Sequence, residues 1–186
     1  MAVPIVMRII AGSARSRRLI APDVSTTRPV TDRVREAVFS MIGSWVSEAR
    51  VADLYAGTGS FGLEALSRGA TSVRFVENNR KAIKVLTENI NTVGLGGTVI
   101  AQDVGVFLRT NQERFHIVFI DPPWEVPSTM VSDQLALLDT MLEQTGEVIV
   151  SRRSGDDGPV VPGNWETVTE RRYGDTKIFR YEKENA

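Results

Sequence analysis

The sequence has 186 residues, a length that predicts one domain with a sizeable core. Lysine and arginine number 22 against 23 acids, so the net charge of −1 gives no global sign of nucleic-acid binding. The absence of cysteine excludes disulfides and Cys-ligated zinc, and no apolar run is long enough to span a membrane. We therefore expect a cytoplasmic protein with no membrane partner.

Residues 1–30 are predicted to form a basic arm and linker. The pattern favours a β-hairpin with strands at 7–11 and 17–21, a turn near Gly12 and an extended linker up to Pro29. Arginine suits bidentate phosphate contacts, and a basic arm on a neutral body is typical of RNA or DNA binding. The alternative is a solvated surface strand pair. The candidate RNA-binding residues of the arm and of the segment that follows it are Arg8, Arg15, Arg17, Arg18, Arg28, Arg33 and Arg35.

Residues 31–186 are predicted to form a single α/β body. A helix begins near Asp32, capped by Thr31 or Asp32, with a core-facing stripe at Val34, Val38, Met41 and Trp45. From residue 51 strands and helices alternate, which indicates a mostly parallel sheet. The predicted strands are 51–55, 72–76, 98–101, 116–120 and 147–150, the helices 60–68, 80–92, 104–110 and 131–143, and an antiparallel hairpin at 165–173 and 177–182 ends the chain.

A glycine-rich turn follows the first strand of the alternating region. Gly57 and Gly59 allow a tight turn and a close approach to a ligand. The turn also contains G-x-G-x-x-G, so a dinucleotide-binding fold has to be weighed, although the chain has no room for a second domain. Each acid at a strand end could instead serve only as the N-cap of the helix that follows it. We predict an S-adenosylmethionine site made by Asp53, Tyr55, Gly57, Gly59, Glu77 and Asp103.

The three acids of this site have separate predicted roles. Asp53 would face the methionine end of the cofactor, Glu77 would accept the ribose hydroxyls, and Asp103 would accept from the adenine amine. We predict no metal site, and we interpret the single histidine, His116, as structural.

The strand at 116–120 ends in Asp121-Pro122-Pro123-Trp124. Two prolines cannot continue a sheet ladder, so the chain must leave the sheet at Asp121. A carboxylate, a carbonyl and an indole at the carboxyl end of a parallel strand suit a planar heterocycle bearing an amine. We predict that Asp121, Pro122 and Trp124 are the catalytic residues. The alternative is a strand-ending turn with Trp124 in the core.

Six segments of the chain fit one pattern, and they are residues 8–12, 15–17, 27–29, 31–39, 62–69 and 121–124. Together they resemble the RsmD family of bacterial 16S rRNA guanine-N2 methyltransferases. The resemblance runs in order from residue 7 to about residue 182, and the basic-arm segments are its most specific part. It implies a Rossmann-like class I methyltransferase fold, with residues 31–186 as the methyltransferase domain. It also implies S-adenosylmethionine as donor and 16S rRNA, within the assembled 30S subunit, as substrate. We expect a monomer.

Three positions depart from the family pattern. Ser16 stands where the family commonly has glycine, and Trp124 where it has Phe or Tyr. Ser151 stands where an acid is often found, so we assign no role to it. Two alternatives stay open: an adenine-N6 methyltransferase acting on DNA or RNA, and a non-catalytic RNA-binding module.

Overall fold

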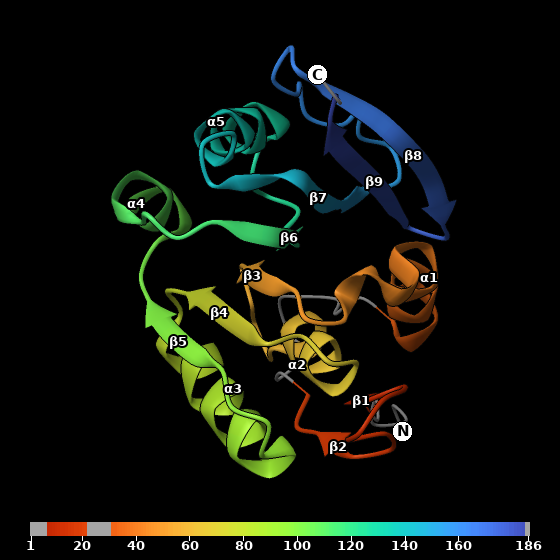
Figure 1. Ribbon diagram of the computed structural model, residues 1–186, viewed down its shortest axis with the longest axis vertical. Helices are drawn as coiled ribbons and strands as arrows, with labels where there is room; N and C mark the ends of the chain where they lie inside the picture. Colours follow the sequence, from red (N-terminus) through yellow and green to blue (C-terminus); the bar gives the residue numbers. More distant parts are fainter. Residues whose placement is uncertain (1–6, 22–30, 185–186) are drawn as a thin grey trace.

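The computed structural model describes residues 7–21 and 31–184, which form an α/β fold (Figure 1). The helices are α1 (Asp32–Ile42), α2 (Ser60–Ser67), α3 (Arg80–Val93), α4 (Val104–Thr110) and α5 (Ser128–Leu138), with a 3-10 turn η1 (Gly43–Val46). The strands are β1 (Met7–Arg8), β2 (Arg18–Leu19), β3 (Arg50–Leu54), β4 (Ser72–Glu77), β5 (Thr98–Ala101), β6 (Phe115–Ile120), β7 (Leu142–Arg153), β8 (Trp165–Tyr173) and β9 (Thr176–Lys183).

Seven strands form the main sheet, in the order β5-β4-β3-β6-β7-β9-β8. Strands β5, β4, β3, β6 and β7 run parallel, and β9 and β8 continue the sheet as an antiparallel hairpin. The strand order reverses between β3 and β6, because the chain first builds outward to β5 and then returns to pair β6 with β3. The predicted fold class is thereby confirmed. No helix in the described parts of the chain is long and apolar enough to cross a membrane.

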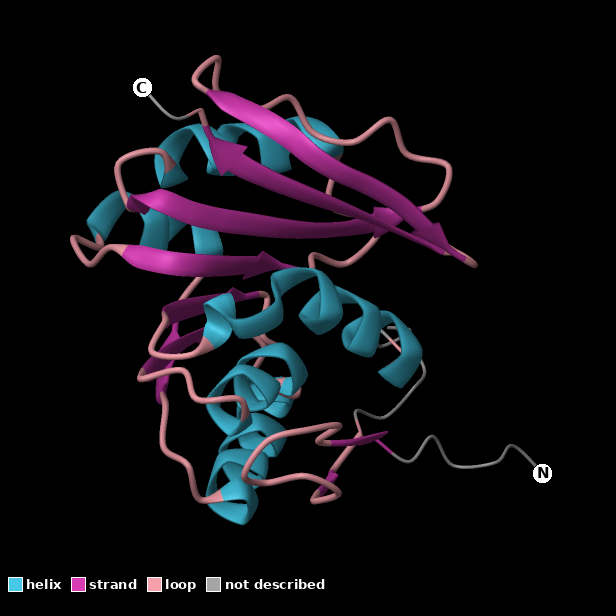
Figure 2. Ribbon diagram, turned by 45° about the vertical axis from the view of Figure 1, so that its right-hand side comes forward, coloured by secondary structure: helices cyan, strands magenta, loops and turns pink. Residues whose placement is uncertain are grey.

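Alternating side chains along the parallel strands supply two cores, one on each face of the sheet. On β6, Ile117 and Phe119 pack with α1, α2 and α3, whereas Val118 and Ile120 pack with α4 and α5. The sequence of a strand that is buried on both faces is a nearly continuous run of apolar residues, and β6 has this pattern. The helices on the two faces can be followed in Figure 2, which turns the molecule by 45°.

The boundary between α5 and β7 differs from the prediction. We placed the helix at 131–143 and the strand at 147–150, but α5 ends at Leu138 and β7 begins at Leu142. Leu142 pairs with Phe115 of β6, and a shift in register follows before Glu147 pairs with Ile117. The apolar residues that we assigned to the end of a helix therefore belong to a strand, because pairing with β6 outweighs local periodicity.

The predicted core position of Trp45 is wrong. Gly43 ends α1 with a φ of +62°, and the chain continues as the 3-10 turn. This change of pitch turns Trp45 outward, where it is 42% exposed, and buries Val46 in its place.

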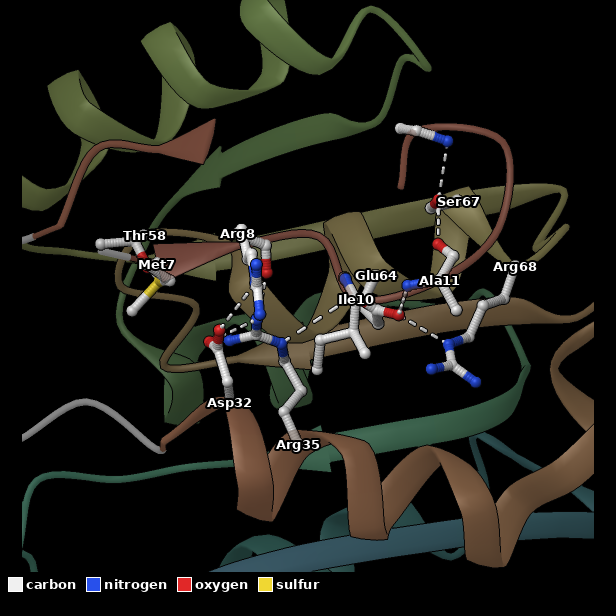
Figure 3. Close-up of polar contacts among 12 residues, drawn as sticks. Met7, Arg8, Ile10, Ala11, Asp32, Arg35, Thr58, Glu64, Ser67 and Arg68 are labelled. Carbon is white, nitrogen blue, oxygen red and sulfur yellow. Dashed lines mark hydrogen bonds and ion pairs between the residues drawn. The ribbon is translucent and has the colours of Figure 1, made fainter. Parts of the chain in front are cut away.

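The N-terminal segment forms a shorter hairpin than predicted. Met7 pairs with Leu19 and Arg8 with Arg18, and Ile9 extends the contact through its amide to the Arg17 carbonyl, 2.9 Å away. The predicted strand should have continued to Ala11. Instead the amides of Ile10 and Ala11 turn away from the hairpin and donate to a carboxylate of α2 (Figure 3).

That carboxylate belongs to Glu64, which is fully buried. Its two oxygens accept from the amides of Ile10 and Ala11 at 2.7 and 3.0 Å, and Oε1 also accepts from the Arg68 guanidinium at 2.7 Å. The buried guanidinium of Arg35 lies 4.0 Å from Glu64 and donates to Asp32 and to the Arg8 carbonyl. A buried charge is tolerated only when it is paired and hydrogen-bonded, and this cluster meets that requirement for Glu64.

Two more buried polar side chains fix the arm. The Ser67 hydroxyl donates to the Ala11 carbonyl at 2.6 Å and accepts from the Ala14 amide at 2.9 Å. Gly12 has a φ of +82°, and a Cβ there would lie 1.8 Å from the Ser67 carbonyl oxygen, so only glycine fits. Asn89 of α3 accepts from the Ile20 amide and donates to the Ile20 and Thr58 carbonyls. The arm is therefore packed against α2 and α3.

The departure at Ser16 falls on a strained backbone. Ser16 has a φ of +67°, a region that glycine adopts without penalty and other residues rarely adopt. The glycine common in the family would relieve this strain, which gives a local reason for that preference.

We expect Glu64→Gln to lower the free energy of unfolding by about 3–5 kcal/mol, because it removes the buried charge opposite Arg68 and leaves the buried Arg35 with only the partly exposed Asp32 as a carboxylate partner. Urea denaturation measures the loss. Hydrogen exchange at the amides of Ile10 and Ala11 should accelerate at the same time.

Glu88→Gln is the matched control, since Glu88 is an exposed glutamate on a helix. Its effect should stay within about 0.5 kcal/mol. Unchanged exchange at Ile10 and Ala11 in Glu64→Gln would contradict the role of Glu64 in holding the arm.

Candidate active site

The predicted site residues gather at one edge of the sheet. Strands β3, β4, β5 and β6 are parallel, so the turns after them leave on the same side (Figure 1). These turns carry the glycine-rich loop, Glu77, Asp103 and the Asp121–Trp124 segment. The glycine-rich loop and Asp121 follow β3 and β6, between which the strand order reverses. That is the position where open α/β sheets bind ligands.

The glycines of the loop serve two different purposes. A Cβ at Gly59 would lie 2.4 Å from Leu86, and one at Gly62 would lie 2.3 Å from Phe75, so both are required for packing of α2 and α3 on the sheet. Gly57 has a φ of +56°, and a Cβ there would meet only the Tyr55 carbonyl, at 3.9 Å. Gly57 therefore presents bare backbone to open space, as a close ligand approach requires.

Asp53 lies at the end of β3 and is 1% exposed. Its Oδ2 accepts from the Gly62 amide at 2.8 Å, which caps the N-terminus of α2. Burial raises the pKa of Asp53 well above its usual value, and the neighbouring carboxylates of Asp121 and Glu77 raise it further. The helix-cap role that we weighed against cofactor contact is thus present, and the contact itself stays a prediction.

Glu77 ends β4 and holds the glycine loop. Oε2 accepts from the Gly57 amide at 2.9 Å, and Oε1 accepts from the amides of Asn78 and Asn79 at 2.9 and 2.8 Å. A carboxylate has about four lone-pair sites, so capacity remains for a hydroxyl donor. Glu77 is partly exposed at the edge of the sheet, which leaves it accessible to a ligand.

Asp103 and Tyr55 flank the same edge. Asp103 is exposed and caps α4, accepting from the Val106 amide at 3.2 Å. Tyr55 has a φ of +59°, an uncommon conformation for a tyrosine, and its hydroxyl accepts from Gln134 at 2.7 Å. Backbone strain of this kind concentrates at functional sites. Partial burial raises the pKa of Tyr55, so its phenol is protonated at neutral pH.

Asp121 leaves the sheet next to Ser151 of β7. Because Ile120 pairs with Val150, the next residues of the two strands are neighbours, and the Ser151 hydroxyl donates to Oδ1 of Asp121. Burial raises the pKa of Asp121 to about 6, and the Ser151 hydrogen bond opposes that shift. No described residue donates to Oδ2, so one oxygen of the carboxylate is open to a ligand.

The rest of the D-P-P-W segment is divided between the interior and the surface. Pro122 is buried, and no described donor is bonded to its carbonyl. Trp124 is 39% exposed, so the alternative that placed it in the core is wrong. The guanidinium of Arg153 lies over the indole, 5.4 Å from the ring centroid.

The arginines predicted to bind RNA do not form one surface. Arg35 has no exposed surface and is part of the Glu64 cluster, so the prediction that it contacts RNA is wrong. Arg17 is exposed, but it donates to the Thr92 and Val93 carbonyls at the end of α3. Arg28 lies outside the described residues. The predicted positions that are exposed and not bound to α3 are Arg8, Arg15, Arg18 and Arg33.

Sequence reasoning missed three residues that shape the site. Ser151 had no assigned role, because only strand pairing brings it to Asp121. Glu64 was noted within a family segment, but nothing in the sequence shows its burial against the arm. Arg153 is the last residue of β7 and stands two positions after Ser151, a spacing that places both on one face of the strand and could have indicated its role.

Comparison with known proteins gives consistent results. The family model described as conserved hypothetical protein 95 matches residues 7–182. Ribosomal RNA small subunit methyltransferase D of Escherichia coli K12 is 33% identical over 181 residues, covering 96% of this chain and 90% of that protein. The protein of the same name from Haemophilus influenzae is 32% identical over 173 residues, covering 90% and 89%. The solved structure of Escherichia coli yhhF superposes with a TM-score of 0.85 at 31% identity, covering 97% and 99%.

We expect the Asp121 carboxyl to titrate with a midpoint of about 6 in a carbon-13 NMR experiment on the folded protein. Ser151→Ala should move the midpoint higher, because the lost hydrogen bond stabilises the ionised form. In the unfolded chain the pKa is roughly 3.9. The folded state therefore binds more protons between these values, and the contribution of Asp121 to the free energy of unfolding falls as pH rises through this window.

Ser40→Ala, a change at an exposed serine of α1, serves as the control and should leave the Asp121 midpoint unchanged. An equal midpoint in Ser151→Ala and Ser40→Ala would rule out the hydrogen bond as a determinant of this pKa.

Proposed function

The chain belongs to the RsmD family and is a methyltransferase, and from this we propose that it methylates the N2 amine of a guanine in 16S rRNA. The proposed donor is S-adenosylmethionine. The observation that carries the proposal is the placement of Asp121, with one free carboxylate oxygen, beside the glycine loop at the strand reversal. The small-subunit enzymes of Escherichia coli and Haemophilus influenzae support the choice of RNA.

The residues at the sheet edge fit S-adenosylmethionine. Gly57 offers open backbone, and Glu77 retains acceptor capacity for the ribose hydroxyls. Asp103 stands exposed at the end of β5, where it can accept from the adenine amine. The bound cofactor supplies an electrophilic methyl group on a sulfonium. Asp53, by capping α2, would hold the loop in the shape that receives it.

The target amine requires activation, because its lone pair is delocalised into the guanine ring. In our proposal Oδ2 of Asp121 and the Pro122 carbonyl each accept one N–H of the amine. These bonds draw the nitrogen toward tetrahedral geometry, so that its lone pair can form the new N–C bond as the S–C bond breaks. Positive charge then develops on the nitrogen, which a fixed carboxylate stabilises. With a pKa of about 6, Asp121 is ionised at neutral pH and can take the proton that the nitrogen loses.

Trp124 provides a flat, exposed surface beside this carboxylate. A base must leave its stack to reach Asp121, and stacking on an aromatic ring stabilises such a base by about 1–3 kcal/mol. Trp124 replaces the Phe or Tyr common in the family and offers a larger ring. Holding amine and donor in line can contribute on the order of 7–11 kcal/mol toward the barrier.

We expect Asp121→Asn to lower the rate of methyl transfer at least about 100-fold, because the amide cannot take the proton or stabilise the charge on the amine. The assay follows labelled S-adenosylmethionine with small subunits that lack the modification, and with the naked rRNA. Mass spectrometry of the nucleosides then identifies N2-methylguanine or N6-methyladenine.

Asp133→Asn, an exposed aspartate of α5, is the control and should keep the wild-type rate. Full activity of Asp121→Asn would refute the catalytic assignment. N6-methyladenine as the product would replace the guanine assignment by the adenine alternative.

We expect Glu77→Ala to weaken S-adenosylmethionine binding by one to two orders of magnitude, since a carboxylate hydrogen bond contributes roughly 1.5–3 kcal/mol. Isothermal titration calorimetry measures the change. Glu166→Ala, at an exposed position of β8, should bind like wild type. No heat of binding in the wild-type protein would favour the non-catalytic RNA-binding module instead.

A further inference from the structure

Trp124 lines two hollows on the surface. One lies toward α5 and the loop after β7 and is bordered by Arg152, Asp156 and Asp157. The other lies between the first turn of α1 and the turn joining β8 to β9, and is bordered by Arg33, Arg172, Tyr173 and Asp175. Each has a volume of about 390 Å³, so size does not distinguish them.

The two hollows differ in charge. In the first hollow, Arg152 is 2% exposed and pairs with Asp156 at 3.0 Å, which leaves the acid Asp157 as its remaining charge. In the second hollow two exposed arginines, Arg33 and Arg172, stand against one acid, Asp175. The second is therefore net cationic and the first net anionic, and a polyanion is attracted only to the second.

The cationic hollow continues toward other exposed arginines. Arg153 lies over the ring of Trp124, at the edge of the sheet that carries Asp121. Arg8 of the arm forms an ion pair at 3.7 Å with Asp32, the residue that precedes Arg33. The turn between β8 and β9 lies on the same side of the molecule as α1 in both views (Figures 1 and 2), and residues of this turn and of the first turn of α1 line the hollow together. Three exposed arginines, Arg33, Arg172 and Arg153, thus lie around Trp124, whereas the charge of Arg8 is offset by its ion pair with Asp32.

We propose that this hollow binds the single-stranded RNA next to the target nucleotide, with Arg33 and Arg172 contacting its phosphates. The proposal rests on the proposed function and adds the C-terminal hairpin to the RNA-binding surface. Arginine is suited to phosphate through its planar set of donors. Arg172 uses its Nε to bond the Gly174 carbonyl at 3.0 Å, which fixes the guanidinium while its terminal nitrogens keep their donors. Tyr173 offers an aromatic ring in the same wall, suited to stacking on a neighbouring base.

The occupant is a single strand because the target base must leave its stack to reach Asp121. A displaced nucleotide carries its neighbours with it, so the strand on each side must run over the protein close to Trp124. The anionic hollow is unsuited to this strand, because Asp157, the acid left over beside the Arg152–Asp156 pair, would face its phosphates. The cationic hollow is the route that remains at Trp124.

The test compares Arg172→Ala with Arg109→Ala in the full-length protein. Each variant loses one positive charge. Arg109 is an exposed arginine at the end of α4, on the opposite face of the sheet from the α1 core, and does not border the cationic hollow. RNA affinity is measured by filter binding with an unmodified rRNA fragment at several salt concentrations. Calorimetry with S-adenosylmethionine and circular dichroism check the cofactor site and the fold.

We expect Arg172→Ala to bind the RNA about tenfold more weakly at low salt. The slope of log affinity against log salt should fall by roughly 0.7, the value for one lost phosphate contact on a single strand. Arg33→Ala should behave in the same way. In the double variant the decrease in slope should be roughly twice that of either single variant. Arg109→Ala should match wild type in both measurements.

Equal affinities and slopes for Arg172→Ala and Arg109→Ala would overturn the proposal while leaving the methyltransferase function intact. A wild-type protein that binds no RNA would overturn both. A loss of S-adenosylmethionine binding in Arg172→Ala would place this residue in the cofactor site and so also exclude the proposal.

Discussion

The parallel pairing of β3, β6 and β7 is the constraint on which the site depends. Parallel hydrogen bonding aligns Leu54 with Ile120 and Ile120 with Val150, so all three strands reach the sheet edge at the same level. The residues that come next, Tyr55, Asp121 and Ser151, are therefore brought to one edge of the sheet although some 30 to 100 positions separate them in the chain. The double proline after Asp121 then turns the chain out of the sheet, and the carboxylate is left at the sheet edge, bonded to Ser151. A shift of one residue in either pairing would turn Asp121 to the opposite face.

A second constraint is the charge of Glu64, which divides the arginines between two tasks. A carboxylate buried in α2 needs donors and a nearby cation, and the N-terminal part of the chain supplies Arg35 together with two backbone amides. A local excess of arginine in the sequence is thus only partly available to a polyanion. The cationic surface near Trp124 is completed by residues from the other end of the chain, Arg153 and Arg172, which local composition would not have grouped with the arm.

The sequence was sufficient wherever a feature depends on its own neighbourhood. The helix of residues 104–110 and the strand of residues 98–101 agree with the prediction at both ends, because caps and breakers flank them directly. The position of the candidate site also follows from local signals, since glycines, acids and prolines mark the ends of strands. The predictions that were wrong or incomplete depended on residues far away in the sequence. Leu142 belongs to a strand because it pairs with β6, and the hydrogen bond from Ser151 to Asp121 exists only through strand register. Burial of Arg35 likewise needs Glu64, which lies on another helix.

The docking of the arm limits how this protein can be divided or recombined. Residues 7–21 look like a detachable extension in the sequence, but they share hydrogen bonds with Glu64, Ser67 and Asn89 of two helices. Glu64 and Gly62 belong to the same short helix, α2, whose N-terminus is held by Asp53 beneath the glycine loop. A chimaera that exchanged the arm between relatives would have to exchange these helical residues with it. The arm is therefore part of the scaffold, and a substitution in it must remain compatible with the residues of α2 and α3 that bond to it.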